Sequence, residues 1–445
     1  MIIGTIIFLA AMFISIALGY SMIPALLLGL CIFTFLGVRR GYSLKQLAVW
    51  GAGSVRESFV VIKVMLIIGI ITAAWRLCGT TTLFVYYGIR LITPPLFLVI
   101  TYLLACLLSY ALGTSFGVTG TLGVIFIALA RSGGVDPVIT ASVIISGVYF
   151  GDRCSPVSSS ANLVAGVTHT DIMTNVKWML RTCVLPFIIT FILYCILSFR
   201  NPLGNVDPEI MRSFEETFSL SAVAFIPAAL MLILPLMKLA VTTSILISAS
   251  AALAIAYFVE GAGFQELVRT CILGYAAPDS GLGAILNGGG VVSMLEVVVI
   301  LIISCTYSGI FNGTGMMEPV HAMLRKSCLR IGRFATCLIF GIVSTILLCN
   351  QTITTLLTGE VMAEPYKSTG GTLQELAIDM ENSNIVVAGL VPWCLGCKVL
   401  TTFMGVGAEA VPYAFYIILI PVCYLFTKKR WFPDRAAGSE LQEGS

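Results

Sequence analysis

The chain has 445 residues, of which 58% are hydrophobic and only 11% charged, and its formal net charge is +3. An average soluble domain carries about 25% charged residues, so this composition excludes an ordinary soluble fold. The small net charge gives no reason to expect a nucleic-acid partner. The sequence predicts an all-α, polytopic membrane protein in contact with the lipid bilayer.

The chain begins with a charge-free run over residues 1–38. We expect a helical hairpin that turns near residues 20–24. The run lacks the basic start of a secretory signal and is too long for one. Residues 43–59 (SLKQLAVWGAGSVRESF) then predict an amphipathic helix ahead of a membrane helix. Further charge-free runs are long enough to cross a bilayer: residues 91–130, 217–237, 239–259, 297–317, 334–359 and 410–427.

The chain divides into two membrane parts. Residues 1–199 and 218–430 are expected to form two repeats of opposite orientation, joined by a polar linker at 200–217 and followed by a polar tail at 431–445. A second amphipathic stretch, residues 263–275, matches the first. Inverted-topology repeats are typical of secondary transporters.

Basic residues indicate the orientation, because Lys and Arg collect in cytoplasmic loops. Segments 39–56, 325–333 and 428–430 are rich in them, whereas 79–93, 200–216 and 260–270 are not. We therefore expect an inner (cytoplasmic) membrane protein with both termini in the cytoplasm.

Four segments break the helical pattern at matching places in the two halves. GTSFGVTGTLG (113–123) and GDRCSPVSSSANL (151–163) lie in the first half, and CNQTITTLLTGE (349–360) and ENSNIVVAGLVPW (381–393) in the second. Irregular backbone at membrane depth occurs only inside protein or along a water-filled cavity. These segments predict broken helices or re-entrant hairpins at the bilayer midplane, where a small ion or polar solute binds.

Asp152 is the leading ionisable candidate, because it follows a long apolar segment and precedes a break, with Arg153 beside it as a candidate partner. A buried carboxylate can exchange a proton for a cation. Glu296 is a second candidate for proton coupling. The remaining candidate ion or substrate ligands are polar residues of the breaks: Thr114, Ser115, Thr119, Ser155, Ser158, Ser159, Asn162, Gln351, Thr352, Thr355, Asn382, Ser383 and Asn384. Asp152, Ser158 and Asn162 are the candidate ligands of Na⁺. No resident cofactor is expected.

These segments resemble the NhaC-type sodium/proton antiporter family. GTSFGVTGTLG, YFGDRCSPVSSSANL (149–163), CNQTITTLLTGEVMAEPY (349–366) and ENSNIVVAGLVPW follow the order of the family's GTSWGTxGTxG, FGDKxSPxSDTTNL, NQ–TxGxMxxxxY and EDSGTVTSPLIPWN. The resemblance implies sodium-coupled antiport on the inverted-repeat fold of the ion-transporter superfamily.

Two family acids are absent here. Ser159 stands where the family pattern has Asp, and Asn382 stands where its EDS motif has Asp. A less acidic site could bind Na⁺ through neutral oxygens or accept an organic solute. Na⁺/H⁺ antiport is thus the first prediction, and cation-coupled transport of an organic acid or amino acid the second.

The sequence also permits a homodimer and a passive channel, and both stay open as hypotheses. An intramembrane aspartyl protease is suggested by Tyr149–Phe150–Gly151–Asp152. However, no Tyr–Asp partner occurs in the chain, and such enzymes need two carboxylates.

Overall fold

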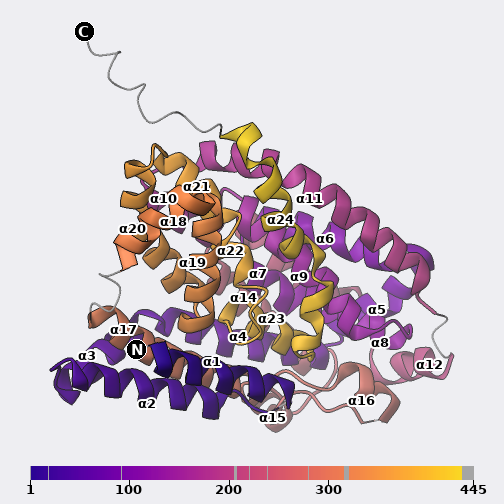
Figure 1. The fold of residues 1–445 in the computed structure, drawn as a ribbon. Coiled ribbons are helices and arrows are strands. Elements are labelled where there is room, and N and C mark those ends of the chain that lie inside the picture. Colours follow the sequence, from indigo (N-terminus) through magenta and orange to yellow (C-terminus); the bar gives the residue numbers. More distant parts are fainter. Residues whose placement is uncertain are drawn as a thin grey trace.

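The structure is a computed structural model that describes residues 2–18, 20–91, 93–204, 208–219, 221–237, 239–278, 280–314 and 320–432. Within these residues it is all-helical, apart from one isolated bridge between Tyr275 and Gly288 (Figure 1). The tail from residue 433 and parts of the linker lie outside the described residues.

Among the described residues, five helices are long and apolar enough to cross a membrane: Pro94–Leu112, Ser115–Ser132, Ile172–Arg200, Val241–Phe258 and Val292–Phe311. A bent pair, Ile62–Leu77 and Thr80–Gly88, makes a sixth if it is one span, with 64° between its parts. The predicted multi-pass, all-α class is confirmed.

The first half comprises helices α1 (Ile2–Ala17), α2 (Ile23–Arg39), α3 (Leu44–Glu57), α4 (Phe59–Leu77), α5 (Thr80–Leu91), α6 (Phe97–Leu112), α7 (Ser115–Val118), α8 (Val124–Ser132), α9 (Pro137–Cys154), α10 (Ser159–Thr168) and α11 (Ile172–Arg200). A π-helix over Thr119–Gly123 joins α7 to α8.

The remainder comprises α12 (Pro208–Thr217) in the linker, then α13 (Ile226–Leu236), α14 (Val241–Phe258), α15 (Phe264–Leu273), α16 (Ser280–Leu286), α17 (Leu295–Gly313), α18 (Val320–Ile331), α19 (Arg333–Leu348), α20 (Gln351–Ser368), α21 (Leu373–Glu381), α22 (Asn384–Val387), α23 (Leu395–Met404) and α24 (Phe415–Trp431).

The N-terminal hairpin and both amphipathic helices form as predicted. α1 and α2 pack side by side, joined by a turn that includes residues 20–22 (Figure 1). α3 begins with a capping box, in which the Ser43 hydroxyl accepts from the Gln46 backbone amide and the Gln46 side chain accepts from the Ser43 backbone amide.

The Glu296 carboxylate at the start of α17 lies 3.5 Å from Lys398 Nζ.

α11 shows how the chain meets lipid. Its 29 residues are about 43 Å long at 1.5 Å per residue, which is ample for a bilayer. One of its faces is exposed and apolar, with Ile188, Ile192 and Ile196 at four-residue spacing. The N-cap Asp171 accepts hydrogen bonds from the Thr174 amide and hydroxyl, both at 2.8 Å, and these lower the pKa of Asp171.

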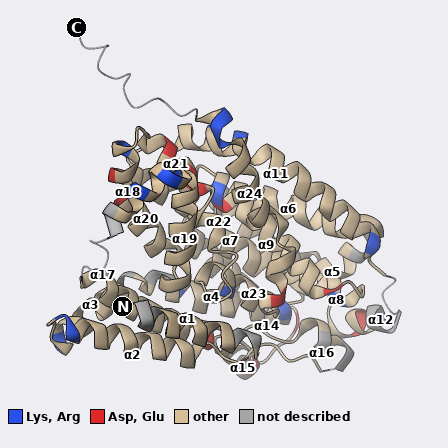
Figure 2. Cartoon of the chain, viewed as in Figure 1, with Lys and Arg blue, Asp and Glu red and all other residues tan. Residues whose placement is uncertain are grey.

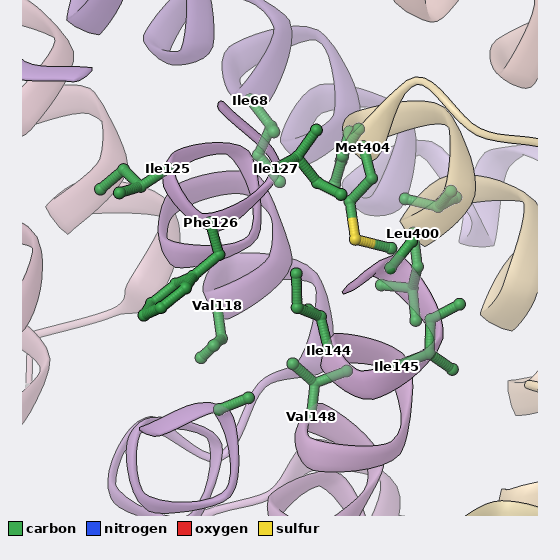
Figure 3. Close-up of a cluster of buried hydrophobic side chains, with 14 of the residues drawn as sticks. Ile68, Val118, Ile125, Phe126, Ile127, Ile144, Ile145, Val148, Leu400 and Met404 are labelled. Atoms are coloured by element: carbon green, nitrogen blue, oxygen red, sulfur yellow. The ribbon is translucent and has the colours of Figure 1, made fainter. Parts of the chain in front are cut away.

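The apolar core lies where α4, α7, α8, α9 and α23 meet. Figure 3 shows Ile68, Val118, Ile144, Leu400 and Met404 converging there from different helices. These side chains are at most 1% exposed. They belong to one buried apolar cluster.

Loops gather at two ends of the molecule. At one end, Tyr86 donates to Glu215 at 2.6 Å and Ser219 donates to Glu260 at 2.6 Å. At the other, Glu375 accepts from Arg333 at 2.9 Å. We call these the Glu260 end and the Glu375 end. α11 connects them, because Asn175 in its first turn bonds Gln374, whereas the segment after its last turn bonds residues 94 and 133.

Charged side chains form a buried network at the Glu375 end. Lys428 Nζ lies 2.6 Å from Glu375 Oε1 and also bonds Asp379. The Asp379 carboxylate accepts from Tyr366 at 2.6 Å and from Tyr424 at 2.9 Å. Acidic and basic positions of the chain lie near one another around α18, α21 and the end of α24 (Figure 2).

Candidate functional site at the helix breaks

The predicted break between α9 and α10 is present, and side chains satisfy its freed backbone groups. α9 ends at Cys154, and Ser155 is extended before Pro156, as expected for a residue that precedes proline. Ser158 is the N-cap of α10: its hydroxyl accepts from the Ala161 amide at 3.3 Å and donates to the Asp152 carbonyl. Asn162 Nδ2 donates to two carbonyls of the break, at 2.9 and 2.7 Å.

The Asp152 carboxylate faces neutral partners from both halves of the chain. It is 3% exposed, and its Oδ2 accepts from Ser160 Oγ at 3.1 Å and from Gln351 Nε2 at 3.3 Å. Ser160 belongs to α10, whereas Gln351 is the first residue of α20. The Glu375-end network does not reach Asp152, so no cation of the described chain neutralises it through an ion pair.

Arg153, the candidate partner of its neighbour Asp152, does not pair with it. The side chain is fully buried, and it donates to Asn382 Oδ1 at 2.6 Å and to Thr182 Oγ1 at 2.8 Å. Adjacent residues on a helix point about 100° apart. Arg153 therefore turns toward α11 and the second-half break while Asp152 turns toward α20.

A second buried carboxylate lies close by. Glu381 is fully buried, and in the described part of the chain neither of its carboxylate oxygens has a hydrogen-bond partner. It precedes Asn382, the residue that holds Arg153, and the charges of Arg153 and Asp152 both act on it. An unpaired buried carboxylate is costly, so this position is a candidate site for a proton or a cation.

The first-half candidates around Gly113 mostly support the backbone. Gly113 ends α6 in the left-handed region at φ +64, and Thr114 caps α7 by accepting from the Gly117 amide at 3.3 Å. Ser115 and Thr119 are buried and bonded to each other, with the Thr119 hydroxyl donating to the Ser115 carbonyl at 2.8 Å. Ser155 is buried and Ser159 is exposed.

The second-half candidates divide in the same way. Gln351 reaches Asp152, Thr355 donates to the Gln351 carbonyl at 2.8 Å, and Thr352 is exposed. Ser383 donates to the Asp379 carbonyl at 2.6 Å, and Asn384 donates to Thr358 at 2.5 Å.

Two further outcomes concern candidate positions. In the second half, the helix that starts at Asn384 has only four residues. The ten-residue helix that follows it in the described chain begins at Leu395. Glu296 is exposed and lies beside Lys398 and Ser21, each at 3.5 Å. It does not join Asp152.

Sequence reasoning chose Asp152 and Gln351 but passed over Ser160 and Glu381. Glu381 carries the same signal that identified Asp152, an acid in an apolar segment at a break. The arrangement can hold a small cation or a proton on buried carboxylate oxygens among neutral oxygen ligands, which suit hard cations.

Comparison with known proteins identifies the family. The profile of the Na⁺/H⁺ antiporter family matches residues 147–428, a range that contains Asp152, Gln351 and Glu381. The chain is 26% identical over 441 residues to a malate-2H⁺/Na⁺-lactate antiporter of Bacillus subtilis (strain 168), covering 95% of this chain and 94% of the relative.

Other relatives are named for different transported substances. The Na⁺/H⁺ antiporter NhaC of Alkalihalophilus pseudofirmus is 26% identical over 368 residues, covering 81% of this chain and 79% of the relative. The arginine/ornithine antiporter ArcD of Halobacterium salinarum is 25% identical over 396 residues, covering 86% and 81%. Because the family profile matches more than half of the chain, the resemblance drawn from the motifs is confirmed: this protein belongs to the Na⁺/H⁺ antiporter family of NhaC and is a multi-pass secondary transporter, not an enzyme.

Proposed function

We propose that this protein exchanges Na⁺ for H⁺ by alternating access, with the Asp152 carboxylate binding either ion and Glu381 as the second acidic group of the site. The observation that carries the proposal is the Asp152 carboxylate itself. It is buried at a helix break, and the described side chains that donate hydrogen bonds to it, Ser160 and Gln351, are neutral. A buried carboxylate without a fixed counter-ion favours neutralisation by a proton or a cation.

A constant spacing of 236 residues supports two repeats, which we place at 1–199 and 218–430. This spacing relates α6 to α19 at both ends, Phe97 to Arg333 and Leu112 to Leu348. It also relates α10 to α23 at both ends, Ser159 to Leu395 and Thr168 to Met404. It pairs the break at 155–158 with residues 391–394 rather than with 381–389, and so pairs Pro156 with Pro392.

The two ten-residue helices support an inverted relation between the repeats. α10 leads from the Asp152 break to Thr170, which bonds Asn175 near the Glu375 end. α23 starts beside Cys349, whose carbonyl accepts from the Leu395 amide at 3.0 Å, and ends at Met404 beside Arg131. Helices that leave the two breaks toward opposite ends suit a site that opens to each side in turn.

The Glu375 end is placed in the cytoplasm. It gathers Arg333 and Lys428 from two basic segments, and such segments stay inside. Both termini then lie in the cytoplasm, and the Glu260 end faces the opposite side of the inner membrane.

The test is Na⁺-driven dissipation of a pH gradient in proteoliposomes, followed with a pH-sensitive dye. Asp152→Asn is expected to abolish the dissipation, because an amide cannot exchange a proton for Na⁺. Asp136→Asn is the matched control, since Asp136 caps the other end of the same helix and Asn caps equally well. Undiminished exchange by Asp152→Asn would overturn the proposal.

A second candidate function is exchange of a small organic solute with Na⁺ or H⁺ as the coupling ion. Relatives named for malate and lactate and for arginine and ornithine favour it, as do the neutral Ser159 and Asn382 at family acid positions. Dissipation of the gradient that needs an added organic acid or amino acid, and not Na⁺ alone, would select this candidate.

A further inference from the structure

A cavity lined by both apolar and basic side chains lies apart from the Asp152 site, near the Glu260 end. It has a volume of about 170 Å³ and is lined by parts of α4, α8 and α23 and by the glycine segment 287–289. Two of its lining residues are arginines, Arg76 and Arg131, and no acid is among the described lining residues.

The Arg76 guanidinium is buried and has no counter-ion among the described residues. The side chain is 8% exposed, and its Nε has no hydrogen-bond partner in the described structure. Within the same part of the chain its one hydrogen bond is long, 3.4 Å from Nη1 to the Thr72 carbonyl of its own helix. Buried arginines normally satisfy their donors with carboxylates or carbonyls, so this position has donors to spare.

Arg131 brings a second unneutralised guanidinium to the same cavity. It is half-buried in the last turn of α8, and its Nη2 lies 3.5 Å from the Met404 carbonyl. Neither arginine forms an ion pair with any described carboxylate. Two like charges facing one small cavity repel each other, and an anion between them would remove that cost.

The backbone opposite Arg76 is shaped to admit its head group. Gly289 has φ +77, and a Cβ there would lie 2.8 Å from Arg76 Nη1 and 2.7 Å from the Ala73 amide nitrogen. A larger residue would therefore displace the guanidinium. Thr402 and Ser293 add hydroxyl groups to the wall.

We infer that this cavity binds the carboxylate of a small organic anion through Arg76 and Arg131. A planar guanidinium matches the two oxygens of a carboxylate. The volume suits a molecule of roughly three to five carbons, given that a cavity of about 150 Å³ holds benzene. The inference deepens the second candidate function by naming an anionic substrate class, and it rests on the proposed function only for the claim that the anion is transported.

The test is calorimetric titration of the full-length chain in phosphatidylcholine nanodiscs with malate, lactate or inorganic phosphate. The variants are Arg131→Gln and Arg76→Gln, and the control is Arg212→Gln, whose exposed side chain pairs with Glu216 at the surface. Malate or lactate should bind the parent chain and Arg212→Gln equally. Arg131→Gln should weaken binding about tenfold or more, as expected for losing a charge-assisted hydrogen bond.

The remaining outcomes are decisive. Equal affinity in Arg131→Gln and the parent chain, or no carboxylate binding by the parent, overturns the inference. Binding of phosphate alone, or displacement of malate by adding an anionic lipid to the disc, assigns the cavity to another oxyanion and also overturns it. If Arg76→Gln does not fold, the half-buried Arg131 still decides.

Failure here and failure of the proposed function are distinguishable. Na⁺-driven dissipation by the parent chain, together with no malate or lactate binding by that same chain, overturns only the anion site. Malate binding that needs Arg131, without any Na⁺/H⁺ exchange by the parent chain, supports the anion site and overturns the proposed function.

Discussion

Two carboxylates and one guanidinium lie buried within a few residues of the helix breaks. Asp152 is held by neutral donors, Arg153 by Asn382 and Thr182, and Glu381 has no hydrogen-bond partner among the described residues. Asp152, the candidate ion ligand, is thus separate from the Arg153 guanidinium. The positive charge of Arg153 helps Glu381 to remain buried.

At this scale we predict that Arg153→Gln destabilises the fold by about 3–5 kcal/mol, since removing one member of a buried charge group leaves the other uncompensated. The double variant Arg153→Gln/Glu381→Gln should recover part of that loss. Thermal unfolding in detergent measures both. The exposed Arg181 on α11 supplies the control, Arg181→Gln. Additive effects of the two substitutions would show that Arg153 and Glu381 do not interact.

A parallel prediction concerns the Glu375 end. Lys428→Met removes the cation that bonds both Glu375 and Asp379, so two buried carboxylates lose a partner. We expect a loss of about 3–5 kcal/mol in unfolding free energy. Thermal unfolding measures this loss, and an unchanged unfolding free energy would contradict this interpretation of the network.

Close helix contact, rather than side-chain chemistry alone, positions the break. α9 lies against α6 at Gly151, where a Cβ would come within 2.0 Å of the Ser109 carbonyl carbon and 2.2 Å of the Tyr110 nitrogen. Both neighbours are backbone atoms, which cannot rotate away. Gly151 therefore lets α9 pack closely against α6 immediately before Asp152.

We predict that Gly151→Ala destabilises the protein by about 1–3 kcal/mol or more through overpacking. Gly166→Ala in α10 is the matched control, because a Cβ there meets no atom within 4 Å and alanine favours a helix. Melting temperatures of the two variants in the same detergent measure the difference. Equal temperatures would contradict the close packing of α6 and α9.

Sequence patterns predicted these elements well where the signal is local. Charge-free runs indicated four of the five long membrane helices of the described chain but not Ile172–Arg200, which contains Lys and Arg. The Ser-Pro and Gly-Thr-Ser segments indicated the breaks. The contacts that the sequence did not predict join residues far apart in the chain. Nothing in the residues near Asp152 shows that Gln351, far along the chain, supplies its second hydrogen bond, or that Arg153 turns to Asn382.

Across the whole molecule, the two loop ends should face opposite sides of the membrane. Ser219→Cys at the Glu260 end should react with a membrane-impermeant maleimide on intact cells, and Ser368→Cys at the Glu375 end only in inverted vesicles. Both positions are exposed, and the chain without either substitution gives the background from its native cysteines. Labelling of both from one side would contradict the proposed topology.

The buried apolar cluster of Figure 3 borders the Arg76–Arg131 cavity. Ile127 and Met404 line that cavity and are part of the cluster. The helix α23, about 15 Å long at ten residues, contributes Met404 to both.

The most direct test of the account is whether protons and Na⁺ compete for one site. The apparent Na⁺ affinity of the reconstituted transporter should be measured across a range of pH from dye-reported exchange rates. Competition at the Asp152 carboxylate predicts that each unit of acidification raises the half-saturating Na⁺ concentration by up to about tenfold. A half-saturating concentration that does not change with pH would show that the two ions bind independently, which contradicts the account.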